Sequence, residues 1–180
     1  MEYMFMPLRR YADFSGRSRR MEFWMWKLFV FLVGVAFWIL MIAMIGGAAF
    51  TSNDPQAIAA AGGGAMIVML LYMLFGLAIF IPDLAVTVRR LHDTNRTGWW
   101  ILAPLVPYLV GIVAMIGGVS TGEQTGAAAG GIVMLVAMLA AFVLAIVLIV
   151  FMFMEGTRGP NRFGSDPKGA ADDDHRRTFA

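Results

Sequence analysis

Hydrophobic residues gather in four long runs, and short segments rich in charge or glycine separate them. A helix needs about 20 apolar residues to cross the hydrocarbon core of a bilayer. Four runs meet that length: residues 27–50, 65–88, 99–119 and 131–154. Because only internally hydrogen-bonded structures span lipid, the pattern predicts an all-α membrane protein built as a bundle of four transmembrane helices.

The segments outside the apolar runs divide the rest of the chain. Residues 1–18 form a basic leader, residues 19–167 hold the four spans with their connecting motifs, and residues 168–180 form a polar tail that we expect to be disordered. The first run is longer than the apolar stretch of a cleavable signal peptide. We therefore expect it to stay in the mature protein as a membrane helix.

Basic residues fall on one side of the predicted membrane. The connections at residues 51–64 and 120–130 contain no Lys or Arg, whereas the connection at residues 89–98 contains three arginines. All 14 Lys and Arg residues lie on that same side, counting Lys27 at the edge of the first span. Because cytoplasmic loops carry an excess of Lys and Arg, we expect both termini in the cytoplasm, in a bacterial cytoplasmic (inner) membrane.

The composition agrees with lipid as the solvent, since 59% of the residues are hydrophobic and only 14% are charged. The formal net charge of +2 is too small to indicate nucleic acid as a partner. The chain has no cysteine, which excludes disulfides, thiolate metal sites and cysteine nucleophiles. No metal-ligand set or cofactor motif occurs in it, so we expect neither a metal nor a cofactor.

Aromatic residues mark the cytoplasmic ends of the first and third spans. An indole ring at such a position buries its apolar body and keeps its N–H in water. Four tryptophans occupy these positions: Trp24, Trp26, Trp99 and Trp100. We predict that they anchor both helices at the interface.

Small residues form a row along the predicted fourth helix. Ala137, Ala141 and Ala145 recur at four-residue spacing, and Gly126 and Gly130 precede them. Small residues let helices approach closely in lipid. We interpret the row as packing within the molecule, and an interface in a homo-oligomer remains the alternative.

The residues that can bind or react lie in three short motifs on the predicted cytoplasmic side. These are FSGRSRRMEFW at residues 14–24, RRLHDTNRTGWW at residues 89–100 and GTRGPNRFGSDP at residues 156–167. A compact helix bundle would bring them together at one membrane surface. The third motif is rich in Gly, Pro and Asn, which predicts an ordered turn segment rather than a helix. The candidate binding residues are Arg17, Arg19, Arg20, Arg89, Arg90, His92, Asp93, Arg96, Asn161, Arg162 and Asp166.

These motifs resemble those of the membrane-protein family catalogued as domain of unknown function 805. The matching residues are Gly16, Arg17, Arg19, Arg20, Phe23, Trp24, Arg89, Arg90, Leu91, His92, Asp93, Gly98, Trp99, Trp100, Gly159, Asn161, Phe163, Gly164, Asp166 and Pro167. The similarity covers residues 11–167 and implies the fold and the location, but no activity. Asn95 stands where the family pattern has glycine, and asparagine is the next best residue for a left-handed turn.

The first motif places cations where a helix disfavours them. If Ser18 caps the first span, Arg19 and Arg20 lie in its first turn, where the helix dipole costs about 0.3–1 kcal/mol for each cation. Some anion should offset this cost. The candidates are lipid phosphates, a bound anionic ligand, or the carboxylates of Glu22, Asp93 and Asp166.

His92 and Asp93 form the one pair in the chain that resembles a catalytic pair. Adjacent residues on a helix point about 100 degrees apart, so these two side chains need not act together. No catalytic triad or phosphate-binding glycine loop accompanies them. We expect Asp93 to cap a turn or pair with an arginine of the first motif and His92 to hydrogen-bond within its loop, and we do not predict an enzyme.

Asp83 lies within an apolar run, where a carboxylate is a candidate functional site. Its neighbour Pro82 cannot donate to the carbonyl four residues earlier, which predicts a kink or a bound water there. Pro104 and Pro107 are expected to loosen the third span at a similar depth and open a polar vestibule. The alternative is that Asp83 reaches toward the interface or an arginine.

Two functions follow from these candidates. The first is a binding or scaffolding protein whose Arg/His/Asp layer engages the anionic headgroups of membrane lipids or docks another membrane protein. The second is a small-solute or ion transporter or channel that uses Asp83 and the proline-kinked helices.

Overall fold

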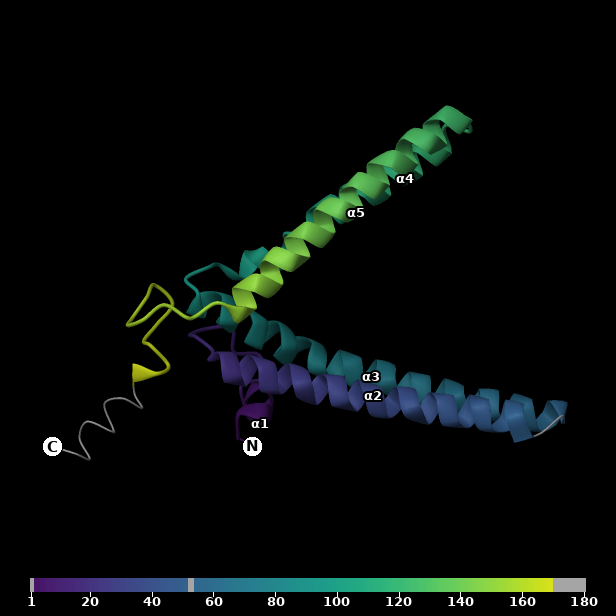
Figure 1. Cartoon of the computed structure of the whole chain (residues 1–180), viewed down its shortest axis with the longest axis horizontal. Helices are drawn as coiled ribbons and strands as arrows, with labels where there is room; N and C mark the ends of the chain where they lie inside the picture. Colours follow the sequence, from purple (N-terminus) through teal and green to yellow (C-terminus); the bar gives the residue numbers. More distant parts are fainter. Residues whose placement is uncertain (1, 52–53, 170–180) are drawn as a thin grey trace. The chain divides into compact units, whose positions relative to one another are not determined.

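The structure is a computed structural model, and it describes residues 2–51 and 54–169. The tail predicted to be disordered therefore lies outside the described residues from residue 170 onward. The described part is helical. Its elements are α1 (Glu2–Arg9), α2 (Arg20–Thr51), α3 (Pro55–Asp93), the short 3₁₀ helix η1 (Gly98–Leu102), α4 (Leu105–Ser120) and α5 (Gln124–Phe153) (Figure 1).

The predicted membrane spans are confirmed. Four helical segments of the described chain are long and apolar enough to cross a membrane: Arg20–Gly47, Pro55–Asp93, Gly98–Ser120 and Gln124–Phe153. The helix α3 is much longer than the predicted span, with 39 residues, or about 58 Å at the usual rise. A bilayer core is about 30 Å thick, so α3 extends beyond it. Its last turn holds Arg90, a cation that suits the negative end of the helix dipole.

The third span is not one continuous α-helix, because its first part is the 3₁₀ helix η1 and α4 begins only at Leu105. Pro104 precedes α4, and Pro107 is the third residue of that helix. The first backbone N–H groups of a helix have no partner within it, so a proline there removes no helical hydrogen bond. The span is thus interrupted next to these prolines, where η1 ends and α4 begins, and the polar vestibule stays a prediction.

The chain forms two compact units. The first comprises Met1–Phe14 and Met21–Val86, and the second comprises Ser15–Arg20 and Thr87–Ala180.

In the first unit, α2 and α3 lie side by side and run in opposite directions (Figure 1). Near one end of the pair, Trp26 of α2 bonds to Asp83 of α3. Further along, the ring of Phe37 lies 5.2 Å from the ring of Tyr72. The short helix α1, which was not expected in the leader, contacts α2 through an edge-on pair of Phe5 and Phe29, with ring centroids 5.4 Å apart.

A residue of the leader compensates for the proline in α3. Pro82 has no N–H, so the carbonyl of Ala78, four residues earlier, has no helical donor. The hydroxyl of Tyr11 donates a hydrogen bond to this carbonyl oxygen at 2.6 Å. The bond occupies the position where the sequence predicted a kink or a water, and it ties the N-terminal segment to α3.

In the second unit, α4 and α5 pack closely along their length (Figure 1). A Cβ atom added at Gly118 would lie 2.2 Å from the carbonyl oxygen of Gly126, and one at Gly130 would lie 2.7 Å from the carbonyl oxygen of Ala114. Ala137 is buried, with its Cβ 2.8 Å from the position of a Cβ at Gly111. The small residues of α5 therefore pack within the molecule, as predicted. Ala141 and Ala145 are half-buried on the same helix.

The four predicted tryptophan anchors differ in exposure. Trp99 and Trp100 are exposed, and Trp24 is half-buried. Trp26 is fully buried, and its N–H donates to the carboxylate of Asp83 rather than to water. This residue is therefore a packing residue of the first unit, because a carboxylate on the facing helix supplies its hydrogen-bond acceptor.

The substitution Tyr11→Phe tests the link between the leader and α3. It removes the donor to the Ala78 carbonyl and should destabilise the protein by about 0.5–1.5 kcal/mol, the net contribution of a typical hydrogen bond. We expect a lower thermal unfolding temperature in detergent. Tyr108→Phe is the control, since the Tyr108 hydroxyl bonds to no residue in the described part of the chain. Equal unfolding temperatures for the two variants would contradict the role of Tyr11.

Candidate functional site

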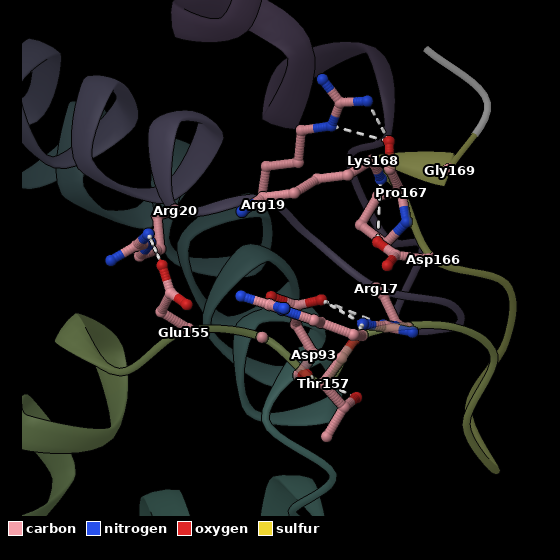
Figure 2. A pocket seen from close by; sticks show the side chains of 12 residues that line it. Arg17, Arg19, Arg20, Asp93, Glu155, Thr157, Asp166, Pro167, Lys168 and Gly169 are labelled. Atoms are coloured by element: carbon pink, nitrogen blue, oxygen red, sulfur yellow. Dashed lines mark hydrogen bonds and ion pairs between the residues drawn. The ribbon is translucent and has the colours of Figure 1, made fainter. Parts of the chain in front are cut away.

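The three motifs meet in the second unit, around the carboxylate of Asp93 (Figure 2). Arg17 donates from Nε to Oδ1 at 2.9 Å, and Arg90 donates from Nη1 to Oδ2. The side chains of Arg17, Arg90 and Asp93 are 1%, 0% and 7% exposed, respectively. Asp93 thus pairs with an arginine of the first motif, as predicted, and also with its own neighbour one turn earlier.

Backbone carbonyls bind the remaining donors of these two arginines. Arg17 donates from Nη1 to the carbonyl of Gly159 at 2.6 Å and from Nη2 to the carbonyl of Thr157. Arg90 donates from Nε to the carbonyl of Met152 at 3.2 Å and from Nη2 to the carbonyl of Met154. The last carbonyls of α5 have no helical donor, so Arg90 acts as the cap of that helix.

The end of α3 is capped in return by the third motif. The backbone N–H of Thr157 donates to the carbonyl of Asp93 at 2.8 Å, and the Thr157 hydroxyl donates to the same oxygen at 3.1 Å. Gly156 precedes this contact, and a Cβ there would lie 2.1 Å from Oδ2 of Asp93. Only glycine leaves room for the carboxylate at this position.

His92 connects the other parts of the motifs. Its ring stacks on Phe163, with centroids 3.9 Å apart and planes 3° from parallel. Its Nδ1 lies 3.2 Å from the carbonyl oxygen of Gly16, and its own carbonyl accepts a bond from Nδ2 of Asn161 at 2.9 Å. His92 and Asp93 therefore face different partners. The ring of His92 contacts residues of the first and third motifs, where a bond within its own loop was expected.

The third motif is an ordered turn segment, as predicted. The carboxylate of Asp166 accepts one bond from the backbone N–H of Lys168 and one from that of Gly159, each 2.9 Å long. These bonds, led by that of Lys168, hold the pKa of the Asp166 carboxyl below its usual value. Their contribution to stability is complete above the ordinary pKa of aspartate and is lost as pH falls through the lowered value.

Asn95 adopts the left-handed conformation expected of it, with φ of 60°. Its carbonyl accepts a bond from Nη2 of Arg162 at 3.1 Å. Two of the predicted binding residues pack on aromatic rings: the guanidinium of Arg162 lies 4.7 Å from the centroid of Phe163, and that of Arg96 lies 3.7 Å from the centroid of Phe151. Neither arginine lines the pocket described below.

The polar pocket has a volume of about 370 Å³ and is lined by residues of the second unit (Figure 2). The lining residues are Arg17, Arg19, Arg20, Asp93, Glu155, Gly156, Thr157, Arg158, Asp166, Pro167, Lys168 and Gly169. Arg19 donates from Nε to the carbonyl of Pro167 at 2.7 Å. Arg20 pairs with Glu155, with Nη2 and Oε1 2.9 Å apart.

The cations at the start of α2 are compensated differently from what the sequence indicated. The helix begins at Arg20, and the Ser18 hydroxyl is buried without a hydrogen-bond partner among the described residues, so Ser18 does not cap the helix. Arg19 precedes the first turn. Glu155, which was not among the candidate anions, supplies the carboxylate for Arg20. The sequence could have indicated Glu155, because it directly follows the fourth span on the side that carries all the basic residues.

Some of the predicted binding arginines are buried, and others line the pocket. Arg17, Arg89 and Arg90 are buried, with Arg17 in the wall of the pocket. The pocket also contains Arg158 and Lys168, which were not among the predicted binding residues. Both are exposed, and neither side chain has an ion pair or hydrogen bond to any residue that the structure describes. Lys168 was assigned to the tail, and Arg158 lacked a distinguishing neighbour in the sequence.

Asp83 lies in the first unit and is paired there. The ammonium of Lys27 lies 2.7 Å and 2.8 Å from its two carboxylate oxygens, and the indole N–H of Trp26 donates to Oδ1 at 2.9 Å. The expected partner of Asp83 was the interface or an arginine. The lysine at the boundary of the first span takes that position.

Four apolar helices and a polar layer at helix ends define this molecule as an integral membrane protein. The chain belongs to the family described as "Protein of unknown function (DUF805)", whose model matches residues 11–165. The resemblance seen in the three motifs is thereby confirmed.

Two relatives from Escherichia coli (strain K12) match the chain over most of its length. Inner membrane protein YhaI is 32% identical over 168 residues, which are 93% of this chain and 97% of the relative. Inner membrane protein YhaH is 31% identical over 172 residues, which are 93% of this chain and 98% of the relative. No solved structure matches the chain. The chain is an integral inner-membrane protein of this family.

Asp93→Asn tests the central role of the carboxylate. Removing its charge leaves two buried guanidinium groups without their anion and should cost about 3–5 kcal/mol. The thermal unfolding temperature in detergent should fall sharply. Asp13→Asn is the matched control. Asp13 forms an ion pair with Arg10, and each of the two side chains is 36% exposed. Such an exposed pair contributes about 1 kcal/mol or less. Similar losses in both variants would refute the assignment.

Proposed function

We propose that this protein is a non-catalytic binding protein of the inner membrane whose polar pocket engages the anionic headgroups of lipids. The observation that carries the proposal is the excess of cations in the pocket. Five basic side chains line it, from Arg17, Arg19, Arg20, Arg158 and Lys168, against the carboxylates of Asp93, Glu155 and Asp166. Each carboxylate already accepts a bond from the protein, so the pocket attracts a further anion.

The position of the pocket along the chain supports a lipid as its occupant. The pocket is built from residues that border the ends of α2, α3 and α5. Basic side chains at the cytoplasmic surface of a membrane gain about 1 kcal/mol each from anionic lipids. The headgroups of the surrounding bilayer are therefore the anions expected closest to the pocket. Docking of another membrane protein stays a prediction without a specific contact to support it.

The partners of the two potentially reactive residues favour binding over catalysis. Asp93 is held by two arginines, and the ring of His92 is stacked and lies beside a backbone carbonyl. A general acid or base must reach a substrate proton, and here both side chains already contact other groups of the protein. No specific observation favours transport, because Asp83 is paired with Lys27.

Native mass spectrometry of the purified protein tests headgroup binding. We expect retention of phosphatidylglycerol over phosphatidylcholine, and we expect Arg19→Gln to weaken that retention about fivefold, which corresponds to about 1 kcal/mol per basic residue. Arg10→Gln is the control, since it removes the same charge from the pair with Asp13, outside the pocket. Equal retention of the two lipids by the unaltered protein would disprove the proposal.

We also propose that both termini face the cytoplasm, which the one-sided distribution of Lys and Arg supports. Green fluorescent protein fused after Ala180 should then fluoresce, because it folds on the cytoplasmic side. Alkaline phosphatase fused after Thr121, between α4 and α5, should be active because that connection would lie outside. Activity of alkaline phosphatase fused after Ala180 would show that the orientation is wrong.

A further inference from the structure

The cations of the pocket are not equivalent, because most of them are engaged by the protein. Arg17 donates to Asp93 and to two carbonyls, and Arg20 donates to Glu155 and to the carbonyl of Phe153. Arg19 donates to the carbonyl of Pro167 from two nitrogens. The bonds to carbonyl oxygens, which carry no net charge, orient the guanidinium groups, while the carboxylates of Asp93 and Glu155 pair with Arg17 and Arg20. The three arginines form a fixed positive wall.

Among the cations that line the pocket, Arg158 and Lys168 are the two whose side chains bond to no residue in the described part of the chain. Both are exposed, and both line the same pocket. Their side chains carry one full charge each, and a guanidinium and an ammonium both bind phosphate oxygens.

A single carboxylate brings the backbones of these two residues together. Oδ2 of Asp166 accepts the N–H of Gly159, directly after Arg158, and Oδ1 accepts the N–H of Lys168, each at 2.9 Å. The segment before them is fixed by Thr157, whose N–H bonds to the carbonyl of Asp93 at 2.8 Å. Two cations ten positions apart in the sequence are therefore held at one opening before any ligand arrives.

We infer that the pocket is a site for a phosphate monoester, with Arg158 and Lys168 binding its terminal oxygens against the wall formed by Arg17, Arg19 and Arg20. This inference rests on the proposed function and narrows its ligand class. A monoester carries a charge of about −1.5 to −2 at neutral pH, which matches two available cations. A phosphodiester such as phosphatidylglycerol carries a single charge and leaves one cation without a counter-charge.

The volume of the pocket agrees with a ligand larger than phosphate itself. Ligand pockets commonly measure about 300–1,000 Å³, and this one measures about 370 Å³. The monoester can come from a lipid headgroup, as in phosphatidate, or from a soluble phosphate ester. Both sources present the same terminal phosphate.

The experiment compares four probes by native mass spectrometry of the full-length protein: phosphatidate, phosphatidylglycerol, phosphatidylcholine and glycerol 3-phosphate. The test variant is Arg158→Gln with Lys168→Gln, and the control is Arg9→Gln with Arg10→Gln, which removes the same charge outside the pocket. We expect the unaltered protein and the control to retain phosphatidate about tenfold more than phosphatidylglycerol. The test variant should retain the two anionic lipids equally.

The outcomes separate the two proposals. If phosphatidate and phosphatidylglycerol are retained equally by the unaltered protein, and both above phosphatidylcholine, the monoester site is wrong and headgroup binding stands. If glycerol 3-phosphate binds and the test variant abolishes this binding while no lipid preference exists, the monoester site stands and its lipid source is wrong. If no phosphate probe exceeds phosphatidylcholine, both proposals fail. Should the double variant unfold, the single variants Arg158→Gln and Lys168→Gln each provide the same comparison.

Discussion

The polar layer depends on one buried carboxylate that neutralises only part of the charge around it. Asp93 faces Arg17 and Arg90, so two guanidinium groups share a single anion. Burying an unpaired charge costs several kcal/mol, and here backbone carbonyls near the end of α5 and in the segment after it bind the remaining donors. Those carbonyls lack helical or strand partners, so the arginines and the chain ends satisfy each other. The segment before α2, the end of α3 and the third motif are thereby fixed to one another.

The membrane helices follow directly from the sequence, since their length and apolar composition leave few alternatives in lipid. Their ends were harder to predict. Residues 89–93 include two arginines and an aspartate and were assigned to a connection, yet they complete the last turn of α3, because cations suit a helix C-terminus. Likewise, Pro104 and Pro107 suggested a loosened third span, and they lie where the 3₁₀ helix η1 ends and α4 begins. In each case, the sequence drew attention to the right residues, but composition alone did not show where they lie relative to the end of a helix.

The three motifs were expected to meet because they lie on the same side of the membrane. The sequence did not indicate which of their arginines would be buried and which exposed. A buried arginine such as Arg90 and an exposed one such as Arg158 have the same side chain, and only the contacts of the fold distinguish them. Similarly, no local pattern pairs Tyr11 with the carbonyl of Ala78, because the two are far apart in the sequence. The defect that Pro82 creates can be predicted locally, whereas its compensation requires the tertiary structure.

Rigidity of the layer bears on how it would bind an anion. A site whose charged groups must be ordered on binding loses part of its affinity to that ordering. In this protein the backbone on either side of Arg158 is fixed by Thr157 and by the carboxylate of Asp166, and Lys168 is fixed by the same carboxylate. Binding would therefore order little more than two side chains. The carboxylates that could oppose an anion are engaged by the layer itself, so the bonds that hold the fold together also keep the pocket positive.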